Sequence, residues 1–199
     1  SGMVGVQPSP LAGYTPATIL GAPKGERLTL RLTAQGRPLT LVKVRGESVQ
    51  HVLMKGFLWA LLLPSYPSVM CELDVGHRYK PDVVSLGATG QAPVCWGECG
   101  AVTVAKLGEL ARDFPATHFA VVKWAHSDIS GHAQQLRSEM ESNGWARERV
   151  APFEVLSIPD NGPDEFITED GEITITRDQL QIVDLAETVD LGGQGDPVR

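Results

Sequence analysis

The chain has 199 residues, of which 42% are hydrophobic and 21% charged, and its formal net charge is −7. This length and composition are typical of one folded domain and exclude a disordered chain. No apolar run approaches the roughly 18 residues of a membrane span, and no segment has the pattern of a signal peptide. We therefore expect no membrane partner and a cytoplasmic location. Three cysteines, too few and odd in number for a disulfide framework, favour the same location.

The charge is unevenly distributed along the chain. Residues 150–199 hold 12 acidic and 2 basic residues, whereas residues 24–123 hold 12 basic and 8 acidic ones. We expect an irregular segment over 1–23, with 1–3 as the remnant of an expression tag. We expect residues 24–149 to form the core of the domain. Residues 150–199 would add an acidic C-terminal β extension and a tail to the same domain. Because the electrostatic field that a partner meets is local, this balance does not exclude a nucleic acid.

The predicted elements follow from hydrophobic periodicity. Residues 28–33 and 38–44 alternate around a turn and predict a β-hairpin. Helical spacing predicts a long apolar helix over residues 49–61, ended by two prolines, and two further helices over 104–112 and 129–142. Strands are predicted over residues 69–75, 82–86, 94–100, 118–124, 152–158 and 172–176. The order predicts an α/β or α+β fold with a mixed β-sheet flanked by helices, and residues 94–124 have the length of a βαβ unit.

Three acidic residues stand where folding does not require them. Glu47 begins the long helix, Asp82 begins a hydrophobic strand after Pro81, and Glu98 interrupts an apolar strand. A carboxylate within a sheet costs several kcal/mol unless it is paired or binds a metal. If the strands of Asp82 and Glu98 pair, their carboxylates converge at one end of the hairpin. Such a pair suits Mg²⁺ or Mn²⁺, and the bound ion can activate water and stabilise charge on a phosphoryl group.

Each acid also has a purely structural interpretation. Glu47 can stabilise the N-terminus of its helix through the macrodipole, and Asp82 can cap a turn. Cys95 and Cys99 do not form a zinc site, because they lie about 13 Å apart at about 3.3 Å per residue of strand. They share one face of the strand, and Glu98 lies on the other face.

Three short motifs resemble those of the YaeQ family within the PD-(D/E)XK, restriction-endonuclease-like nuclease superfamily. The resemblance covers roughly residues 28–125 and depends on the order of Gly46-Glu47-Ser48, Lys80-Pro81-Asp82-Val83 and Trp96-Gly97-Glu98-Cys99-Gly100. It implies a restriction-endonuclease-like core with an N-terminal β-hairpin and a C-terminal β extension. It also implies a Mg²⁺-dependent nuclease that hydrolyses DNA phosphodiester bonds, with Glu47, Asp82 and Glu98 as metal ligands.

One position departs from the superfamily pattern. Two residues after Glu98, where the nuclease motif has a lysine that orients the attacking water, the chain has Gly100. Lys106 on the following helix is the first candidate to replace it, because a long side chain can reach back toward the acids. Lys123 on the neighbouring strand is the second. We therefore expect Asp82, Glu98 and Lys106 to be the catalytic residues. The alternative for Lys106 is an ordinary solvated lysine.

Four basic residues lie beside these acids in the sequence: Lys43, Arg45, Arg78 and Lys80. They are candidates to contact the phosphate backbone of DNA, and the alternative is ordinary solvated charge. Two other functions compete with the nuclease. One is a nuclease fold without catalysis that binds nucleic acid or a protein. The other is a structural or regulatory module, in which residues 150–199 would form the contact of a homo-oligomer.

Overall fold

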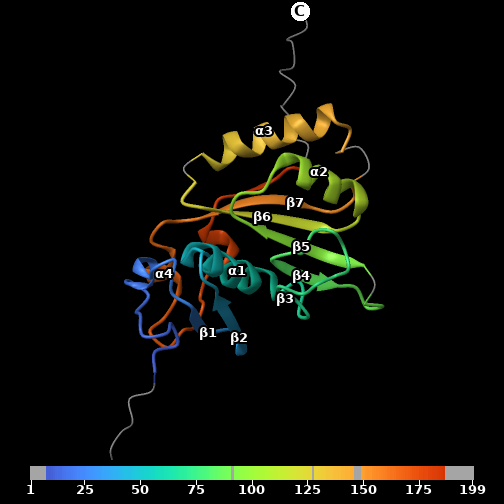
Figure 1. The fold of residues 1–199 in the computed structure, drawn as a ribbon. Coiled ribbons are helices and arrows are strands. Elements are labelled where there is room, and N and C mark those ends of the chain that lie inside the picture. The colour runs from blue at the N-terminus through green and yellow to red at the C-terminus, as the bar shows by residue number, and fades with distance from the viewer. Residues whose placement is uncertain (1–7, 91, 127, 146–148, 187–199) are drawn as a thin grey trace, which may run out of the picture.

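A computed structural model describes residues 8–90, 92–126, 128–145 and 149–186 of the chain. The predicted tag remnant and the end of the predicted tail lie outside these residues. Figure 1 shows four layers: two helices, α2 and α3, lie over one face of a central sheet, helix α1 lies under the other face, and a two-stranded hairpin covers the far side of α1. The predicted fold class is confirmed, because the molecule is a mixed α+β structure with helices on both faces of its main sheet.

Strands alternate with helices along most of the chain. In order, the elements are η1 (a 3-10 helix, Ile19–Gly21), β1 (Leu28–Ala34), β2 (Arg37–Lys43), α1 (Val49–Leu62), β3 (Met70–Cys71), β4 (Val83–Leu86), β5 (Pro93–Cys99), α2 (Val104–Asp113), β6 (His118–Trp124), α3 (Ile129–Ser142), β7 (Phe153–Ile158), α4 (Gly162–Phe166), η2 (a 3-10 helix, Arg177–Gln179) and β8 (Ile182–Asp184).

The main sheet has six strands in the order β3-β4-β5-β6-β7-β8. Strands β5, β6 and β7 run parallel, while β3, β4 and β8 pair antiparallel with their neighbours. The βαβ unit predicted from the sequence is confirmed, because α2 connects the parallel strands β5 and β6. The carboxyl ends of three parallel strands therefore meet at one edge of the sheet, which is where open α/β sheets bind ligands.

Helix α1 is buried on nearly every side. Ser48 caps it by accepting a hydrogen bond from the His51 N–H, and 12 of its residues are buried. A helix that is apolar all round belongs inside a protein, and α1 packs between the main sheet and the β1–β2 hairpin (Figure 1). Gly56 faces the hairpin, where a Cβ atom would be in van der Waals contact, at 3.4 Å, with both Leu32 and Leu41.

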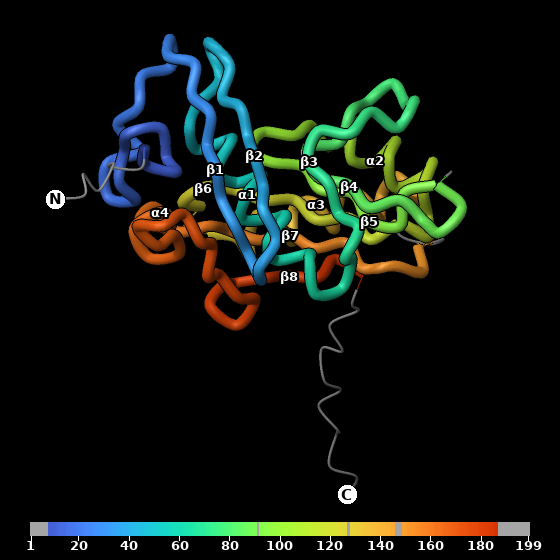
Figure 2. Tube along the Cα trace, turned by 90° about the horizontal axis from the view of Figure 1, so that it is seen from below, coloured from blue at the N-terminus to red at the C-terminus, as the bar shows by residue number. Residues whose placement is uncertain are grey.

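The outer edge of the hairpin is covered by a segment from the other end of the chain. The Thr33 N–H donates to the Gly171 carbonyl at 2.9 Å, and the Ile173 N–H donates to the Thr33 carbonyl at 2.7 Å. Figure 2 shows β1 beside the orange C-terminal segment that follows β7. Residues far apart in the sequence thus complete one layer of the fold.

Two strand predictions need correction. The strand predicted over 69–75 is limited to Met70–Cys71, because Glu72 has a φ of 57° and turns the chain out of extended conformation. The segment 172–176 is not a strand and forms only isolated bridges, although Ile173 and Ile175 are buried as their alternation indicates. The sequence reasoning missed four short elements: η1, α4, η2 and β8. No helix in the described ranges is long and apolar enough to span a membrane.

Candidate functional site

The two acids singled out in the sequence lie opposite each other on neighbouring strands. The register pairs Val83 of β4 with Gly97 of β5, so the next residues outward are Asp82 and Glu98. The Asp82 N–H donates to the Gly97 carbonyl at 3.1 Å and holds the start of β4 against β5. The two carboxylates have different partners, because Asp82 contacts His51 of α1 and Glu98 contacts Lys106 of α2. The predicted pairing of these strands is confirmed.

Glu98 is buried and lies between two donors. Its Oε2 is 2.7 Å from Lys106 Nζ, and its Oε1 accepts a hydrogen bond from the Trp96 indole at 2.8 Å. Burial raises the pKa of Glu98 above its ordinary value, and the negative charge of Asp82 adds to this rise. Hydrogen bonds from Lys106 and Trp96 oppose it without cancelling it.

Lys106 reaches the acid from the helix that follows β5. Thr103 caps α2 and accepts a hydrogen bond from the Lys106 N–H, which places this lysine in the first turn of the helix. The Lys106 side chain extends back to Glu98, which it contacts at 2.7 Å. Lys123, the second candidate, donates instead to the Gly100 carbonyl at 2.8 Å.

Asp82 turns toward the opposite helix. Its Oδ2 accepts a hydrogen bond from the Cys99 N–H at 2.8 Å, and its Oδ1 lies 3.2 Å from Nε2 of His51 on α1. Burial alone would raise the pKa of Asp82, but the interactions with His51 and Cys99 outweigh it, and the pKa lies below its ordinary value. The same interaction raises the pKa of His51, although burial of the imidazole opposes this. Asp82 therefore favours its charged form.

Glu47 belongs to a neighbouring ion-pair network. Its Oε1 is 2.8 Å from Lys55 Nζ, and the same ammonium lies 2.6 Å from Oε1 of Glu72. The Lys55 side chain is only 2% exposed. Burial lowers the pKa of Lys55, but the hydrogen bonds to Glu47 and Glu72 outweigh this, so the pKa is raised. His51 connects this network to Asp82, because its Nε2 lies 3.8 Å from Glu47 Oε1.

Sequence reasoning missed His51, Lys55 and Glu72. A signal for the first two was present, because Glu47, His51 and Lys55 are four residues apart in turn and therefore share one face at the start of α1. Glu72 follows the short strand β3 and has no such spacing to the others. Only the fold brings it to Lys55.

Gly100 adopts a conformation that disfavours a lysine. Its φ is 83°, in the left-handed region, and a Cβ atom there would lie 3.5 Å from Met54 Cε and 3.7 Å from His51 Nδ1. The imidazole of His51 thus lies beside the position at which the nuclease motif has its lysine. Gly100 thus leaves this region without the lysine of the nuclease motif. A basic group reaches the region from each flanking helix: His51 from α1 and Lys106 from α2.

The four basic candidates differ in their surroundings. Lys43 is fully buried, and its ammonium donates to the carbonyls of Pro23, Lys24 and Glu26 at 2.9, 3.0 and 2.6 Å. The assignment of Lys43 to a DNA-contacting surface is therefore wrong, because no part of its side chain faces solvent.

The other three candidates are exposed. Arg45 and Lys80 are at the surface, and within the described ranges neither side chain has an ion-pair partner. Arg78 is also exposed, but it is already engaged: its Nη2 lies 2.5 Å from Glu109 Oε2, and it contacts the Tyr79 hydroxyl. Contact of these three residues with DNA stays a prediction.

The acidic residues of the site differ in how far they are available to bind a metal ion. Among the described residues, no group of three or more His, Cys, Asp or Glu side chains is arranged to hold a metal. Asp82 and Glu98 offer two carboxylates, each oxygen of which has one donor and therefore a further lone pair. Mg²⁺ commonly binds one or two carboxylates and completes its shell with water and substrate phosphate, so a shared ion would require Asp82 to turn from His51 of α1 toward Glu98 beside α2. Glu47 is held by Lys55 and does not belong to this pair.

The cysteines are free thiols outside the site. Cys95 and Cys99 lie in the core on the α1 side of the sheet, whereas Trp96 lies in the core on the α2 side, as period-two alternation predicts. Burial raises the pKa of Cys95 to about 12 and also raises that of Cys99. The two thiols therefore stay protonated and behave as core side chains.

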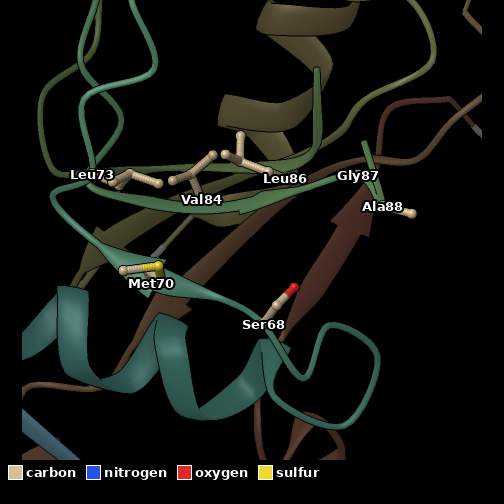
Figure 3. A pocket seen from close by; sticks show the side chains of 7 residues that line it. All are labelled: Ser68, Met70, Leu73, Val84, Leu86, Gly87 and Ala88. Atoms are coloured by element: carbon tan, nitrogen blue, oxygen red, sulfur yellow. The ribbon is translucent and has the colours of Figure 1, made fainter. Parts of the chain in front are cut away.

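A pocket of about 420 Å³ lies at the far end of β4, away from the acids (Figure 3). Its lining is mostly apolar and includes none of the acidic or basic residues described above. It is formed by Ser68, Met70, Leu73, Val84, Leu86, Gly87 and Ala88. We therefore place the candidate site at the opposite end of this strand, around Asp82 and Glu98.

Comparisons with known proteins give a limited result. No protein-family model matches the sequence, and no curated protein matches it. The chain is similar to solved structures of YaeQ proteins. The YaeQ protein from Xanthomonas axonopodis pv. citri is 14% identical, with a TM-score of 0.45, over 80% of this chain and 89% of that one. The YaeQ protein from Pseudomonas syringae is 12% identical, with a TM-score of 0.42, over 68% of this chain and 74% of that one. At these values the similarity says nothing about activity.

Proposed function

We propose that the protein is a nuclease that hydrolyses phosphodiester bonds in DNA, with Asp82, Glu98 and Lys106 as its catalytic residues. One observation supports this above the others: Lys106 Nζ lies 2.7 Å from the buried Glu98 carboxylate, opposite Asp82 on the next strand. Two acids and a lysine at the end of paired strands are the groups that the PD-(D/E)XK pattern requires, and here the lysine comes from α2 instead of β5. The resemblance of the motifs to the superfamily agrees with this arrangement.

The residues have separable roles in such a reaction. The Lys106 ammonium orients the attacking water and stabilises negative charge on the phosphoryl group, as preorganised cations do in water-poor sites. Glu98 holds the Lys106 ammonium in place through their 2.7 Å contact. Asp82, whose pKa is lowered, stays ionised. Asp82 and Glu98 would also hold Mg²⁺ or Mn²⁺, and the bound cation stabilises charge on the phosphate.

A second function is a catalytically degenerate nuclease fold that binds nucleic acid or a protein partner. A specific observation favours it: each acid already has a basic partner, Asp82 with His51 and Glu98 with Lys106, and Gly100 stands in place of the strand lysine. In that case the charges of the site are balanced internally and contribute to stability alone.

Cleavage of linear and circular DNA with Mg²⁺ or Mn²⁺ tests the first function. We expect Glu98→Gln and Lys106→Met each to lower the cleavage rate by about 10²–10³-fold, since each removes a charge that acts on the transition state. The matched control is Glu165→Gln, which changes an exposed acid on α4. Unchanged cleavage in Glu98→Gln would reject the catalytic assignment. A wild-type protein that binds DNA without cutting it with either cation would support the second function.

A further inference from the structure

Three basic side chains gather at the carboxyl end of β6, outside the site described above. Lys123 lies near the end of this strand, His126 follows it, and His132 lies in the first turn of α3. The imidazole rings of His126 and His132 stack with their centroids 5.2 Å apart and their planes at 33°. Figure 1 shows α3, the helix that comes next in the chain after β6, above the sheet. We call these three residues the basic cluster.

The basic cluster is not neutralised by the part of the protein that the structure describes. None of its members forms an ion pair there, and Lys123 Nζ donates to the Gly100 carbonyl at 2.8 Å. Burial lowers the pKa of His132, and the positive charges of Lys123 and His126 lower it further, as like charges in one neighbourhood do. An anion bound among them would remove this repulsion.

Asp128, which lies between the two histidines in the sequence, and Asp160, which lines a cavity with His126, are engaged elsewhere. Asp128 caps α3 through its Oδ1, which accepts a hydrogen bond from the Gly131 N–H at 2.8 Å. Asp160 accepts a hydrogen bond from the Trp124 indole at 3.2 Å. Among the described residues neither carboxylate forms an ion pair with the basic cluster, so its donors remain available to a ligand.

A shallow surface cavity of about 400 Å³, wide open to solvent, adjoins the basic cluster and shares His126 with it. It lies where β6 and β7 end, at the edge of a parallel sheet where ligands commonly bind. Its volume is within the range of small-molecule sites. Its wall combines apolar and hydrogen-bonding groups, namely Ala125, His126, Ser157, Pro159, Asp160, Gln179, Leu180 and Gln181.

The cavity and the basic cluster lie at the same sheet edge as the proposed catalytic residues. Gly100 follows β5, and its carbonyl accepts the hydrogen bond from Lys123 of β6. Its own N–H donates to the Val122 carbonyl at 2.8 Å. The ends of β5 and β6 are therefore joined, and a strand of nucleic acid that crosses this edge would pass from one site to the other.

We propose that Lys123, His126 and His132 bind a phosphate group of a nucleic-acid strand, and that the adjoining cavity receives the attached nucleoside. The ammonium and the two imidazoles supply the N–H donors that phosphate oxygens accept. Asp160 Oδ2, Gln179 Nε2 and Gln181 Oε1 supply acceptors and a donor for a base or sugar, while the other polar atom of each side chain bonds within the protein. The identity of the ligand rests on the proposed function, but binding requires no cleavage.

Binding in EDTA separates this inference from the nuclease assignment. We would measure fluorescence anisotropy of a labelled single-stranded oligonucleotide, with and without a 5′-phosphate. We expect Lys123→Met and the double variant His126→Asn/His132→Asn each to weaken binding by about tenfold or more, as loss of a charge-assisted hydrogen bond does. The matched control, Lys24→Met, removes an exposed lysine on the hairpin side. A loss confined to the phosphorylated strand assigns a terminal monoester, and a loss with both strands assigns an internal diester.

A second measurement avoids dependence on the variants. In wild-type protein, titration with inorganic phosphate should shift the imidazole NMR signals of His126 and His132 and leave those of His77 in place. Thermal unfolding shows whether each variant is folded. Affinity equal to that of Lys24→Met in both variants, or imidazole signals that phosphate does not move, would overturn the inference. Binding without cleavage in Mg²⁺ would refute the nuclease alone.

Discussion

Replacement of Lys43 by methionine separates a structural role of this lysine from a DNA-binding role. The ammonium is fully buried and donates to three backbone carbonyls, at Pro23, Lys24 and Glu26. It therefore ties the segment before β1 to the end of β2. Methionine preserves the apolar length of the side chain and removes all three donors.

The size of the effect follows from those contacts. A buried acceptor left without a donor costs about 1–3 kcal/mol. Loss of the donor to all three carbonyls sets the upper limit of the loss in the free energy of unfolding. Two effects reduce that loss. The carbonyls belong to exposed residues and can turn to water, and the cost of burying an ammonium, several kcal/mol, disappears. We expect a net loss of about 3 kcal/mol in the free energy of unfolding. At about 2–4 °C per kcal/mol for a chain of this size, Tm falls by roughly 6–12 °C.

Calorimetry and urea unfolding of the purified protein measure this loss directly. Arg45→Met is the matched control, because Arg45 lies two residues away with an exposed side chain, and its free energy of unfolding should change by no more than about 0.5 kcal/mol. The reasoning is refuted if Lys43→Met unfolds at the wild-type temperature and binds DNA more weakly. That result would place Lys43 at an interface.

Two further predictions concern stability. The buried carboxylate of Glu154 on β7 lies 3.0 Å from His118 and 2.5 Å from Arg177. Burial raises the pKa of Glu154, but the interactions with His118 and Arg177 outweigh the effect of burial and hold this pKa below its ordinary value. Its stabilisation is therefore present above the ordinary value near pH 4.5 and is lost as the pH falls through the lower folded-state pKa. Glu154→Gln should cost about 2 kcal/mol at pH 7, and urea unfolding should show the difference from wild type shrinking toward pH 3; a constant difference would contradict the pairing. Gly97→Ala should cost about 1–3 kcal/mol, because its Cβ would lie 2.4 Å from Leu58, and an unchanged Tm would show that α1 can shift.

The main elements of the fold could be predicted from the sequence because their periodicity is long. The helix from Val49 has four turns of apolar residues, and the strand from His118 has seven residues with a buried pattern. The three residues of β8 are too few to show a period. The end of β3 depends on one residue, Glu72, whose positive φ is set by its tertiary contacts and not by its type.

Those parts of the candidate site that depend on the pairing of strands or on the length of a side chain could be predicted from the sequence. Asp82 and Glu98 lie opposite each other because their strands pair, and Lys106 reaches Glu98 because α2 begins beside β5. The burial of Lys43 could not be predicted, because a lysine beside an exposed turn has the same local sequence whether its ammonium is solvated or enclosed. The basic cluster also required the fold, since it joins a strand, a loop and a helix.

The pairing of residues 171–173 with the outer edge of β1 affects the order in which the protein folds during translation. The hairpin emerges early, but Gly171 and Ile173, which pair with Thr33, are synthesised far later. Until then the peptide groups of Thr33 are unpaired, although Arg31 already donates to the Pro10 carbonyl, and unpaired strand edges are the feature through which nascent chains join one another. Final closure of this layer therefore waits for translation of the segment around residue 173, and a message truncated before that codon would yield chains prone to associate.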